Sequence, residues 1–294
     1  MKKYIISLVA MATVLASCTS DVEEAIEIKN DNQKQEYILS LKSLEFEDAT
    51  RVNLVATNTG ITFTWSFNEV FGVFPINPSN GQVRWNLTAS DCSDENHYAK
   101  FSGQGWQLEK NVQYAAYHPF NGKITTETPY TSIPVELPQN QAGTLAEIGK
   151  YYDFTWAVGT YKGDVDNVEP KKNVVFDFNH AISVVEIVIP DKAEKDAGVI
   201  VEFENNTYIT KGLLNAGTGV VTGSEYKNTI SLAGSSTNQS GKQVCYLAIF
   251  PTTLGEVSIH YYDNNYKYIT AKHNFNGKNI QAGKAYRWNS WQEQ

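Results

Sequence analysis

The stretch that decides the fold of this chain is VVFDFNHAISVVEIVIP, residues 174–190. In its first half apolar and polar side chains alternate, which is the period of a strand that buries one of its two faces. The apolar positions are Val174, Phe176, Phe178, Ile182 and Val184, and the positions between them include Asp177, Asn179, Ala181 and Ser183. This alternation predicts a β-strand.

The second half of the same stretch is apolar on both faces, with Glu186 as the exception. Either the strand is covered on both sides, or a bulge near Val184 and Val185 moves the apolar set to the other face. Pro190 ends the strand because proline has no N–H to donate to a neighbouring strand. Since short strand-like blocks flank this stretch, we interpret it as the opening strand of a second β domain.

Short alternating blocks separated by turn residues fill most of the remaining chain, and helical periodicity is almost absent. The first block runs from Tyr37 to Phe46 and changes phase near Lys42, which predicts a bulged strand. Later blocks recur roughly every 8–12 residues, a spacing typical of β-sandwiches. The predicted fold class is therefore all-β, with two consecutive antiparallel β-sandwich domains of Greek-key connection at residues 37–172 and 173–294.

The composition is that of a β-rich globular protein. The chain has 294 residues, enough for two domains of ordinary size, and 12% of them are aromatic while 19% are charged. The formal net charge is -8, and it falls further if Lys2 and Lys3 are removed with a leader, because 22 of the 24 basic residues then remain against 32 acidic ones. An acidic chain without a basic patch argues against nucleic acid or an anionic membrane surface as a partner.

The N-terminus has the features of a secretory leader. Lys2 and Lys3 give it a positive start, and Tyr4–Val14 is an apolar run shorter than the ~20 residues that span a bilayer. The sequence LASC at residues 15–18 then matches a bacterial lipobox, in which the thiol of Cys18 is acylated and Cys18 becomes the first residue of the mature chain. The alternative is an ordinary signal peptide followed by a chance cysteine.

Lipidation of Cys18 predicts an outer-membrane lipoprotein. Acyl chains hold a soluble domain on a membrane because each buried methylene contributes about 0.8 kcal/mol. On this interpretation residues 1–17 are the signal peptide and residues 18–36 form an acidic tether. The tether is too polar to bury a core of its own, so we expect it to be a linker.

The remaining cysteines, Cys92 and Cys245, fall in different predicted domains. A disulfide between them is compatible with an oxidising compartment but is not favoured, and two cysteines do not make a disulfide scaffold. The chain contains no CxxC or HExxH motif and no cluster of His and Cys. The sequence therefore predicts neither a metal nor a cofactor.

No motif of an enzyme is present either. The GTGVVTG of residues 217–223 resembles a phosphate loop only superficially, and hairpin turns are the prediction for this glycine-rich stretch. The five histidines have no catalytic partner at motif spacing, so we interpret them as structural and predict no catalytic residue. They are His97, His118, His180, His260 and His273. The many Tyr and Trp residues are compatible with a glycan-binding face, but aromatic strand positions are more often core or cross-strand pairs.

Several short motifs, taken in order, resemble one family. They are Ala49-Thr50-Arg51, the VFGVFP of residues 70–75, the YAAYHP of residues 114–119, the FNHAIS of residues 178–183 and the AGKAY of residues 282–286. Together with the lipobox at Cys18, their order and spacing over most of the mature chain resemble the fimbrillins, the lipoprotein precursors of type V pili of Bacteroidales, and related fimbrillin-like proteins. The resemblance implies transthyretin-like sandwiches and a fimbrium at the cell surface. The acidic residues just behind Cys18 likewise resemble the surface-export signal of Bacteroidales lipoproteins.

The resemblance also implies a route of maturation. In the family a trypsin-like protease cuts after a basic residue in the loop that follows the first strand, and another subunit replaces the lost strand by β-augmentation. Arg51 is the residue that matches this site, and it is one of only three arginines. The alternative is a solvated loop arginine in a chain that is never cut.

One feature departs from the stalk subunits of that family. Only eight residues follow Tyr286, too few for a long donor segment beyond a strand of the body. We therefore expect a tip or accessory fimbrial subunit whose partners are other pilin subunits. The alternative is a monomeric surface lipoprotein that binds a glycan or host ligand.

Overall fold

The computed structural model describes residues 35–41, 44–47, 60–61, 69–76, 85–93, 98–103, 111–125, 127–161 and 175–294. Cys18, His97 and Arg51, and with them the leader and most of the tether, lie outside these residues. The predicted all-β class is confirmed, because nearly every described element is a strand. The described helical structure is a single turn, α1 (Leu145–Glu147), which continues as a π-helical turn, η1 (Ile148–Tyr152).

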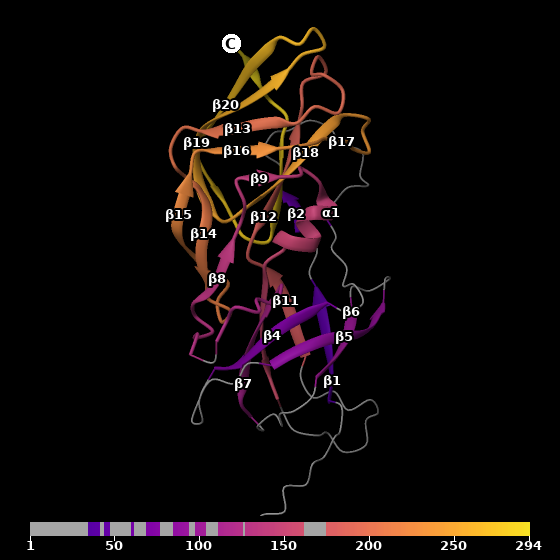
Figure 1. Ribbon diagram of the computed structural model, residues 1–294, viewed down its shortest axis with the longest axis vertical. Coiled ribbons are helices and arrows are strands. Elements are labelled where there is room, and N and C mark those ends of the chain that lie inside the picture. The colour runs from indigo at the N-terminus through magenta and orange to yellow at the C-terminus, as the bar shows by residue number, and fades with distance from the viewer. Residues whose placement is uncertain are drawn as a thin grey trace, which may run out of the picture. The chain divides into compact units, whose positions relative to one another are not determined.

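Seven strands close into a barrel (Figure 1). In the order of their pairing they are β1 (Gln35–Leu41), β11 (Val175–His180), β10 (Thr155–Thr160), β7 (Gln113–His118), β4 (Val70–Pro75), β5 (Trp85–Ser93) and β6 (Tyr98–Gly103). The β1–β11 pair is parallel, whereas the other pairs are antiparallel. Closure leaves this sheet without a free edge.

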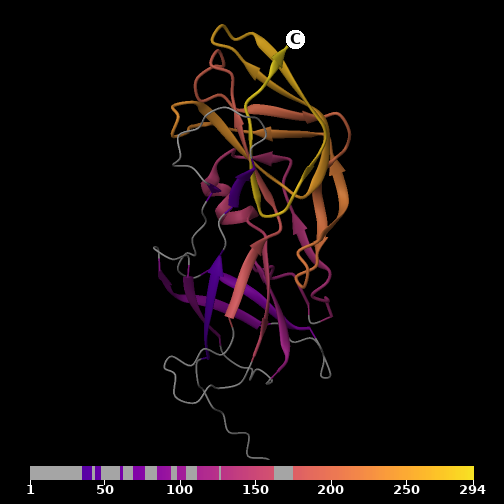
Figure 2. The same cartoon turned by 180° about the vertical axis from the view of Figure 1, so that it is seen from behind.

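Two six-stranded sheets and one three-stranded sheet form the remainder (Figure 2). The first contains β17 (Ser236–Thr237), β18 (Gln243–Ile249), β12 (Ser183–Val188), β21 (Lys284–Trp288), β2 (Leu44–Glu47) and β3 (Gly60–Ile61). The second contains β22 (Gln292–Glu293), β20 (Tyr268–Ile280), β19 (Thr252–Tyr262), β13 (Val199–Phe203), β16 (Thr229–Leu232) and β9 (Asn140–Gln141). The third contains β15 (Val221–Lys227), β14 (Tyr208–Leu214) and β8 (Ile133–Glu136).

The stretch at residues 174–190 forms two strands where the alternation predicts one. β11 ends at His180 in the barrel, and β12 begins at Ser183 in a different sheet. The first five residues of β12 are buried and its pairing with β18 runs without a shift, so the interpretation as a covered strand is confirmed and the bulge near Val184 is not observed. The chain changes sheets at Ala181 and Ile182, a change that side-chain alternation does not encode.

Strand pairing crosses the predicted boundary at residues 172/173 in both directions. β11, from the C-terminal side, pairs with β10 and β1 in the barrel. β8 and β9, from the N-terminal side, pair with β14 and β16. Residues 34–294 form one unit by their contacts, and the division into two sandwich domains stays a prediction.

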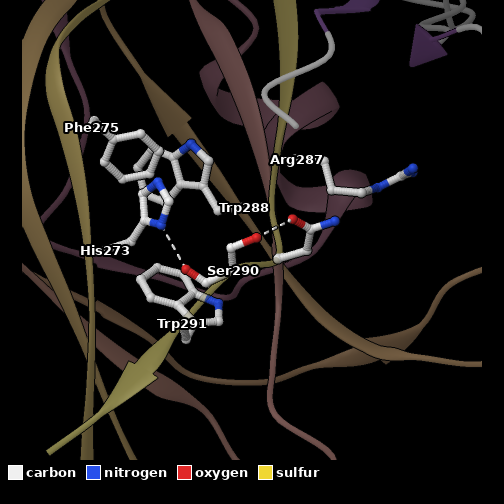
Figure 3. Close-up of a pocket in the computed structure, with 7 residues that line it drawn as sticks. His273, Phe275, Arg287, Trp288, Ser290 and Trp291 are labelled. Atoms are coloured by element: carbon white, nitrogen blue, oxygen red, sulfur yellow. Dashed lines mark hydrogen bonds between the residues drawn. The ribbon is translucent and has the colours of Figure 1, made fainter. Parts of the chain in front are cut away.

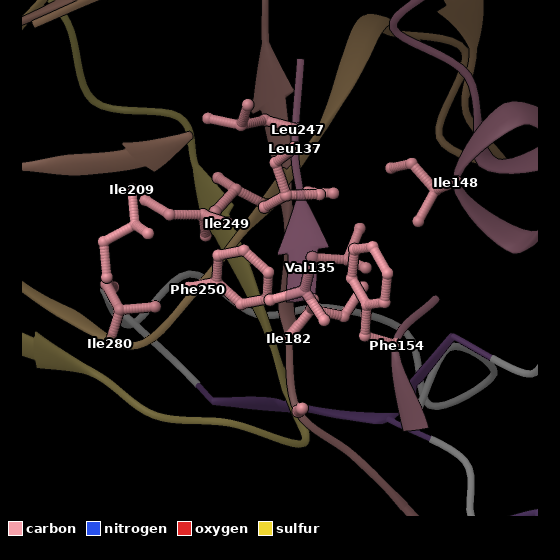
Figure 4. Close-up of a cluster of buried hydrophobic side chains, with 14 of the residues drawn as sticks. Val135, Leu137, Ile148, Phe154, Ile182, Ile209, Leu247, Ile249, Phe250 and Ile280 are labelled. Atoms are coloured by element: carbon pink, nitrogen blue, oxygen red, sulfur yellow. The ribbon is translucent and has the colours of Figure 1, made fainter. Parts of the chain in front are cut away.

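One hydrophobic core draws side chains from several sheets (Figure 4). Phe154 stacks on Phe250 with a centroid distance of 5.7 Å, next to Ile182 and Val135. The buried Gln141 of β9 joins two sheets, because its side-chain amide donates to the Ala248 carbonyl and its oxygen accepts from the Ala248 N–H. The small polar network is satisfied internally, as a buried amide requires.

Candidate functional site

The first strand occupies the middle of a sheet. β1 pairs in parallel with β11, where Ile38 lies opposite Val175, and antiparallel with β6, where Ile38 lies opposite Lys100. Figure 1 shows β1 beside both neighbours. A strand paired on both sides uses the N–H and C=O groups along both edges. Its removal would leave two rows of unpaired groups in an opened barrel.

The single bulged strand expected from Tyr37 to Phe46 is divided between two sheets. β1 ends at Leu41, and β2 starts at Leu44 beside β21 and β3. β2 is again paired on both sides, in parallel with β21 and antiparallel with β3. β1 thus lies in the barrel and β2 in a second sheet, and each of them is paired on both sides.

A buried polar cluster lies where β7, β10 and β11 meet. Thr155 of β10 is opposite His118 of β7 on one side and His180 of β11 on the other. His180 Nδ1 hydrogen-bonds to Asp153 Oδ1, and His118 Nε2 lies 3.9 Å from Glu69 Oε2. Burial lowers the pKa of His118 to about 4, although the charge of Asp153 and a backbone hydrogen bond with Asp153 act in the opposite direction.

The other two described histidines are held by ordinary contacts. His260 bonds to Glu202 and to Thr270, both at 3.0 Å, and stacks on Tyr268. His273 Nδ1 lies 2.6 Å from the Ser290 carbonyl, to which it donates. These contacts give each imidazole a structural role.

An aromatic cluster surrounds a shallow pocket next to His273 (Figure 3). The ring of His273 lies edge-on to Phe275 at 4.4 Å, and Phe275 lies 4.8 Å from Trp288. Trp291 donates from its indole N–H to the Val188 carbonyl at 3.0 Å, whereas the buried Trp288 N–H has no partner within the described part of the chain. The pocket is too small for a ligand, and the cluster fastens the C-terminal residues to β20.

A larger cleft of about 470 Å³ opens beside β10 and β11. Its wall includes Trp156, Asn179 and His180 from these strands. Thr218, Gly219 and neighbouring residues come from the β14–β15 turn. The sequence prediction of hairpin turns in this glycine-rich stretch is confirmed, but no local signal places the turn against β10. The strand alternation does put Asn179 on the polar phase, which is the one hint of this site in the sequence.

Within the residues that the structure describes, no group of His, Cys, Asp and Glu side chains could hold a metal ion. Cys245 is a buried free thiol. No helix in the described part of the chain is both long and apolar enough to cross a membrane.

The sequence matches a protein-family profile described as fimbrillin-like over residues 50–290. Among solved structures, a "putative cell adhesion protein" from Bacteroides ovatus aligns with a TM-score of 0.54 at 14% identity, covering 89% of this chain and 96% of that chain. The C-terminally truncated tip fimbrial protein Mfa3 from Porphyromonas gingivalis aligns with a TM-score of 0.41 at 7% identity, covering 81% of each chain. The Bacteroides ovatus match indicates a shared fold. No curated protein matches the chain.

Proposed function

The chain belongs to the fimbrillin-like family, and we propose that it is a tip or accessory subunit of a type V pilus that is assembled by strand exchange after proteolysis at Arg51. As a member of this family it is a fimbrial-type protein of the cell surface. We further propose that it is exported as an outer-membrane lipoprotein acylated at Cys18, and that it has no enzymatic activity.

The observation that supports strand exchange is the pairing of residues 35–47. β1 and β2 are central strands in two sheets, so cleavage behind them would free a segment whose departure opens both. The groups left unpaired can be satisfied by an extended segment of another subunit, which is the physical basis of β-augmentation. Pairing along two edges gives the incoming strand more backbone hydrogen bonds than one open edge would.

The contacts of the C-terminal residues support a tip or accessory position. β22 pairs with β20 of the same chain at Ala271 and Lys272, and the N–H of Gln294 donates to the Thr270 carbonyl. Residues held in this way within their own subunit are not available as a donor strand. In this proposal the chain accepts a donor strand from a partner pilin and does not supply one from these residues.

Limited proteolysis of the chain without its leader tests this proposal. Low-dose trypsin should release the segment before Val52, identified by N-terminal sequencing, and the product should form SDS-resistant ladders with other pilins. The Arg51→Gln variant should resist this cut and stay monomeric, whereas Arg84→Gln, at another of the three arginines, should behave as wild type. Clean cleavage at Arg51 without assembly in the presence of pilin partners would contradict the proposal.

Labelling with a palmitate analogue tests the anchor separately. The wild-type precursor should incorporate the label and partition with outer membranes, and Cys18→Ala should do neither. Incorporation into the Cys18→Ala variant would contradict acylation at this residue.

The second candidate is a monomeric surface protein that binds a glycan or host ligand. The cleft beside Trp156 favours it, because its volume falls in the range of roughly 300–1,000 Å³ that is usual for ligand pockets. Binding and polymerisation are compatible with each other, so each needs its own test.

A further inference from the structure

The cleft beside β10 and β11 has an aromatic side chain and an amide side by side on one wall. Trp156 and Asn179 lie directly opposite each other on neighbouring antiparallel strands, so their side chains leave the sheet on the same face. Both are partly exposed and both line the cleft. An indole next to a carboxamide offers an apolar flat surface together with a donor and an acceptor.

The wall next to Trp156 is a fixed turn. Gly219 has a φ of +74°, and a Cβ on it would lie 2.0 Å from Trp156 Nε1, so the turn packs directly against the indole. Backbone N–H groups of Thr218 and Gly219 both donate to the Asn215 carbonyl, at 3.1 and 2.7 Å. The turn and the tryptophan therefore hold each other in place before any ligand binds.

A supporting contact also orients the amide. Asn179 Nδ2 donates to the Asp177 carbonyl at 3.2 Å. This contact restricts the rotamer of Asn179, which lowers the entropy that a ligand would have to overcome. His180 follows Asn179 on the strand, so its buried side chain lies on the other face, where its Nδ1 hydrogen-bonds to Asp153.

Among the described residues that line the cleft, none is an Asp, Glu, Lys or Arg. Phosphates, carboxylates and ammonium groups would lose their hydration there without an ionic partner, which is costly. A long aliphatic ligand would offer no hydrogen bond to the Asn179 amide or the Thr218 hydroxyl and would shield both from water. The chemistry that fits is a neutral ring with one apolar face and a rim of hydroxyl groups.

We propose that this cleft binds a neutral pyranose at the end of a glycan, with its apolar face on Trp156 and its hydroxyls on Asn179 and Thr218. The inference deepens the ligand-binding part of the proposed function by giving it a site and a ligand class. The lining residues belong to β10 and later elements and not to β1 or β2, so the site can be tested on the uncleaved chain.

Saturation-transfer-difference NMR on the full chain without its leader tests the proposal. The probes are free glucose, galactose, mannose, fucose and N-acetylglucosamine, with sialic acid as the charged comparison. At least one neutral sugar should give transfer signals, and sialic acid should give none. Trp156→Ala and Asn179→Ala should weaken the binding by about tenfold or more, and Trp156→Phe should retain part of it.

Val158→Ala is the matched control. Val158 lies two residues beyond Trp156 on the same face of β10, is 37% exposed, and does not line the cleft. Tyr266→Ala, at a tyrosine that is 75% exposed elsewhere, controls for binding by surface aromatics in general. Both controls should bind as wild type.

Two results would overturn the proposal. One is the absence of transfer from every neutral sugar with the folded wild-type chain. The other is sugar binding that is unchanged in Asn179→Ala and in a folded Trp156 variant. Sugar binding that is weakened as much in Val158→Ala or Tyr266→Ala as in these variants would count in the same way. A chain that binds no sugar but forms ladders after cleavage would remove the sugar site and leave the pilus assignment intact.

Discussion

Glu186 and Arg287 lie opposite each other on the parallel strands β12 and β21 and form a two-pronged ion pair. Arg287 Nε is 2.6 Å from Glu186 Oε1, and Nη2 is 3.3 Å from Oε2. The Tyr246 hydroxyl and the Asn238 amide donate to the same carboxylate, at 3.3 and 3.1 Å. The one charged residue in the apolar stretch is thus fully satisfied, although its side chain is only 4% exposed.

Replacing Glu186 by Ala should lower the free energy of unfolding by about 3–5 kcal/mol, because the largely buried Arg287 would lose its ion pair with this carboxylate. The double variant Glu186→Leu with Arg287→Leu should be more stable than Glu186→Ala, since neither charge then remains. Urea denaturation measures both. Lys211→Ala, which breaks the exposed pair with Glu225, is the control and should leave stability nearly unchanged. A double variant no more stable than Glu186→Ala would contradict this account.

The lowered pKa of His118 should make the chain acid-sensitive. Its pKa is 6.5 when exposed and about 4 in the folded state, so between these values the unfolded chain binds the additional proton. Stability is therefore full above pH 6.5 and falls as the pH drops toward 4, by on the order of 3 kcal/mol from this group.

Unfolding titrations of wild type and His118→Gln over this pH range test the prediction. The difference in free energy of unfolding between wild type and His118→Gln should shrink as the pH falls, because the glutamine side chain does not take up a proton. Carboxylates that titrate in both proteins contribute equally to the two curves, so the difference isolates His118. Parallel curves for wild type and His118→Gln would rule out the burial effect.

Gly219 and Gly241 form a matched pair for testing the contact of the turn with Trp156. Their φ angles are +74° and +75°, so alanine costs about 1 kcal/mol of backbone strain at both. Only at Gly219 would the new Cβ meet an indole, whereas no described atom lies within 4 Å of a Cβ at Gly241. Gly219→Ala should therefore be less stable than Gly241→Ala by about 1–3 kcal/mol in urea denaturation. Equal losses would mean that the turn does not pack on Trp156.

Cys245 should be chemically silent in the folded protein. Burial raises the pKa of its thiol to about 12, and its Sγ lies 3.0 Å from the Gly234 carbonyl. The reactive thiolate is therefore absent near neutral pH. Peptide mapping after N-ethylmaleimide treatment should find Cys245 unmodified in native buffer and modified in denaturant. Rapid modification under native conditions would contradict the buried position.

The segment from Tyr37 to Phe46 shows what the alternation of apolar and polar residues can and cannot predict. Apolar and polar residues alternate from Tyr37 to Phe46, as in a strand. The phase change near Lys42 coincides with a break between two strands, because β1 ends at Leu41 and β2 begins at Leu44. The interpretation as one bulged strand is wrong, since the two halves join different sheets. A phase change reports that the buried face switches, but a bulge and a change of sheet produce the same pattern.

The candidate sugar site could not be predicted from the sequence, because it also depends on which strands pair. Trp156 and Asn179 meet only because β10 and β11 pair in one register, and the turn at Gly219 reaches them from a later hairpin of the chain. Each residue alone has an ordinary explanation as a strand or turn position. Their proximity is a property of the pairing.

By itself the sequence determined the all-β class, the strand character of residues 174–190, the lone charge at Glu186 and the fimbrillin-like motifs, because side-chain period and turn residues act locally. Only the tertiary structure decided that β1 lies between β11 and β6, that β8 pairs with β14, and that Trp156 faces Asn179. The alternation of apolar and polar residues determines which face of a strand is buried, but it does not determine which strands pair with its two edges. The partner at each edge is chosen by packing between residues far apart in the chain.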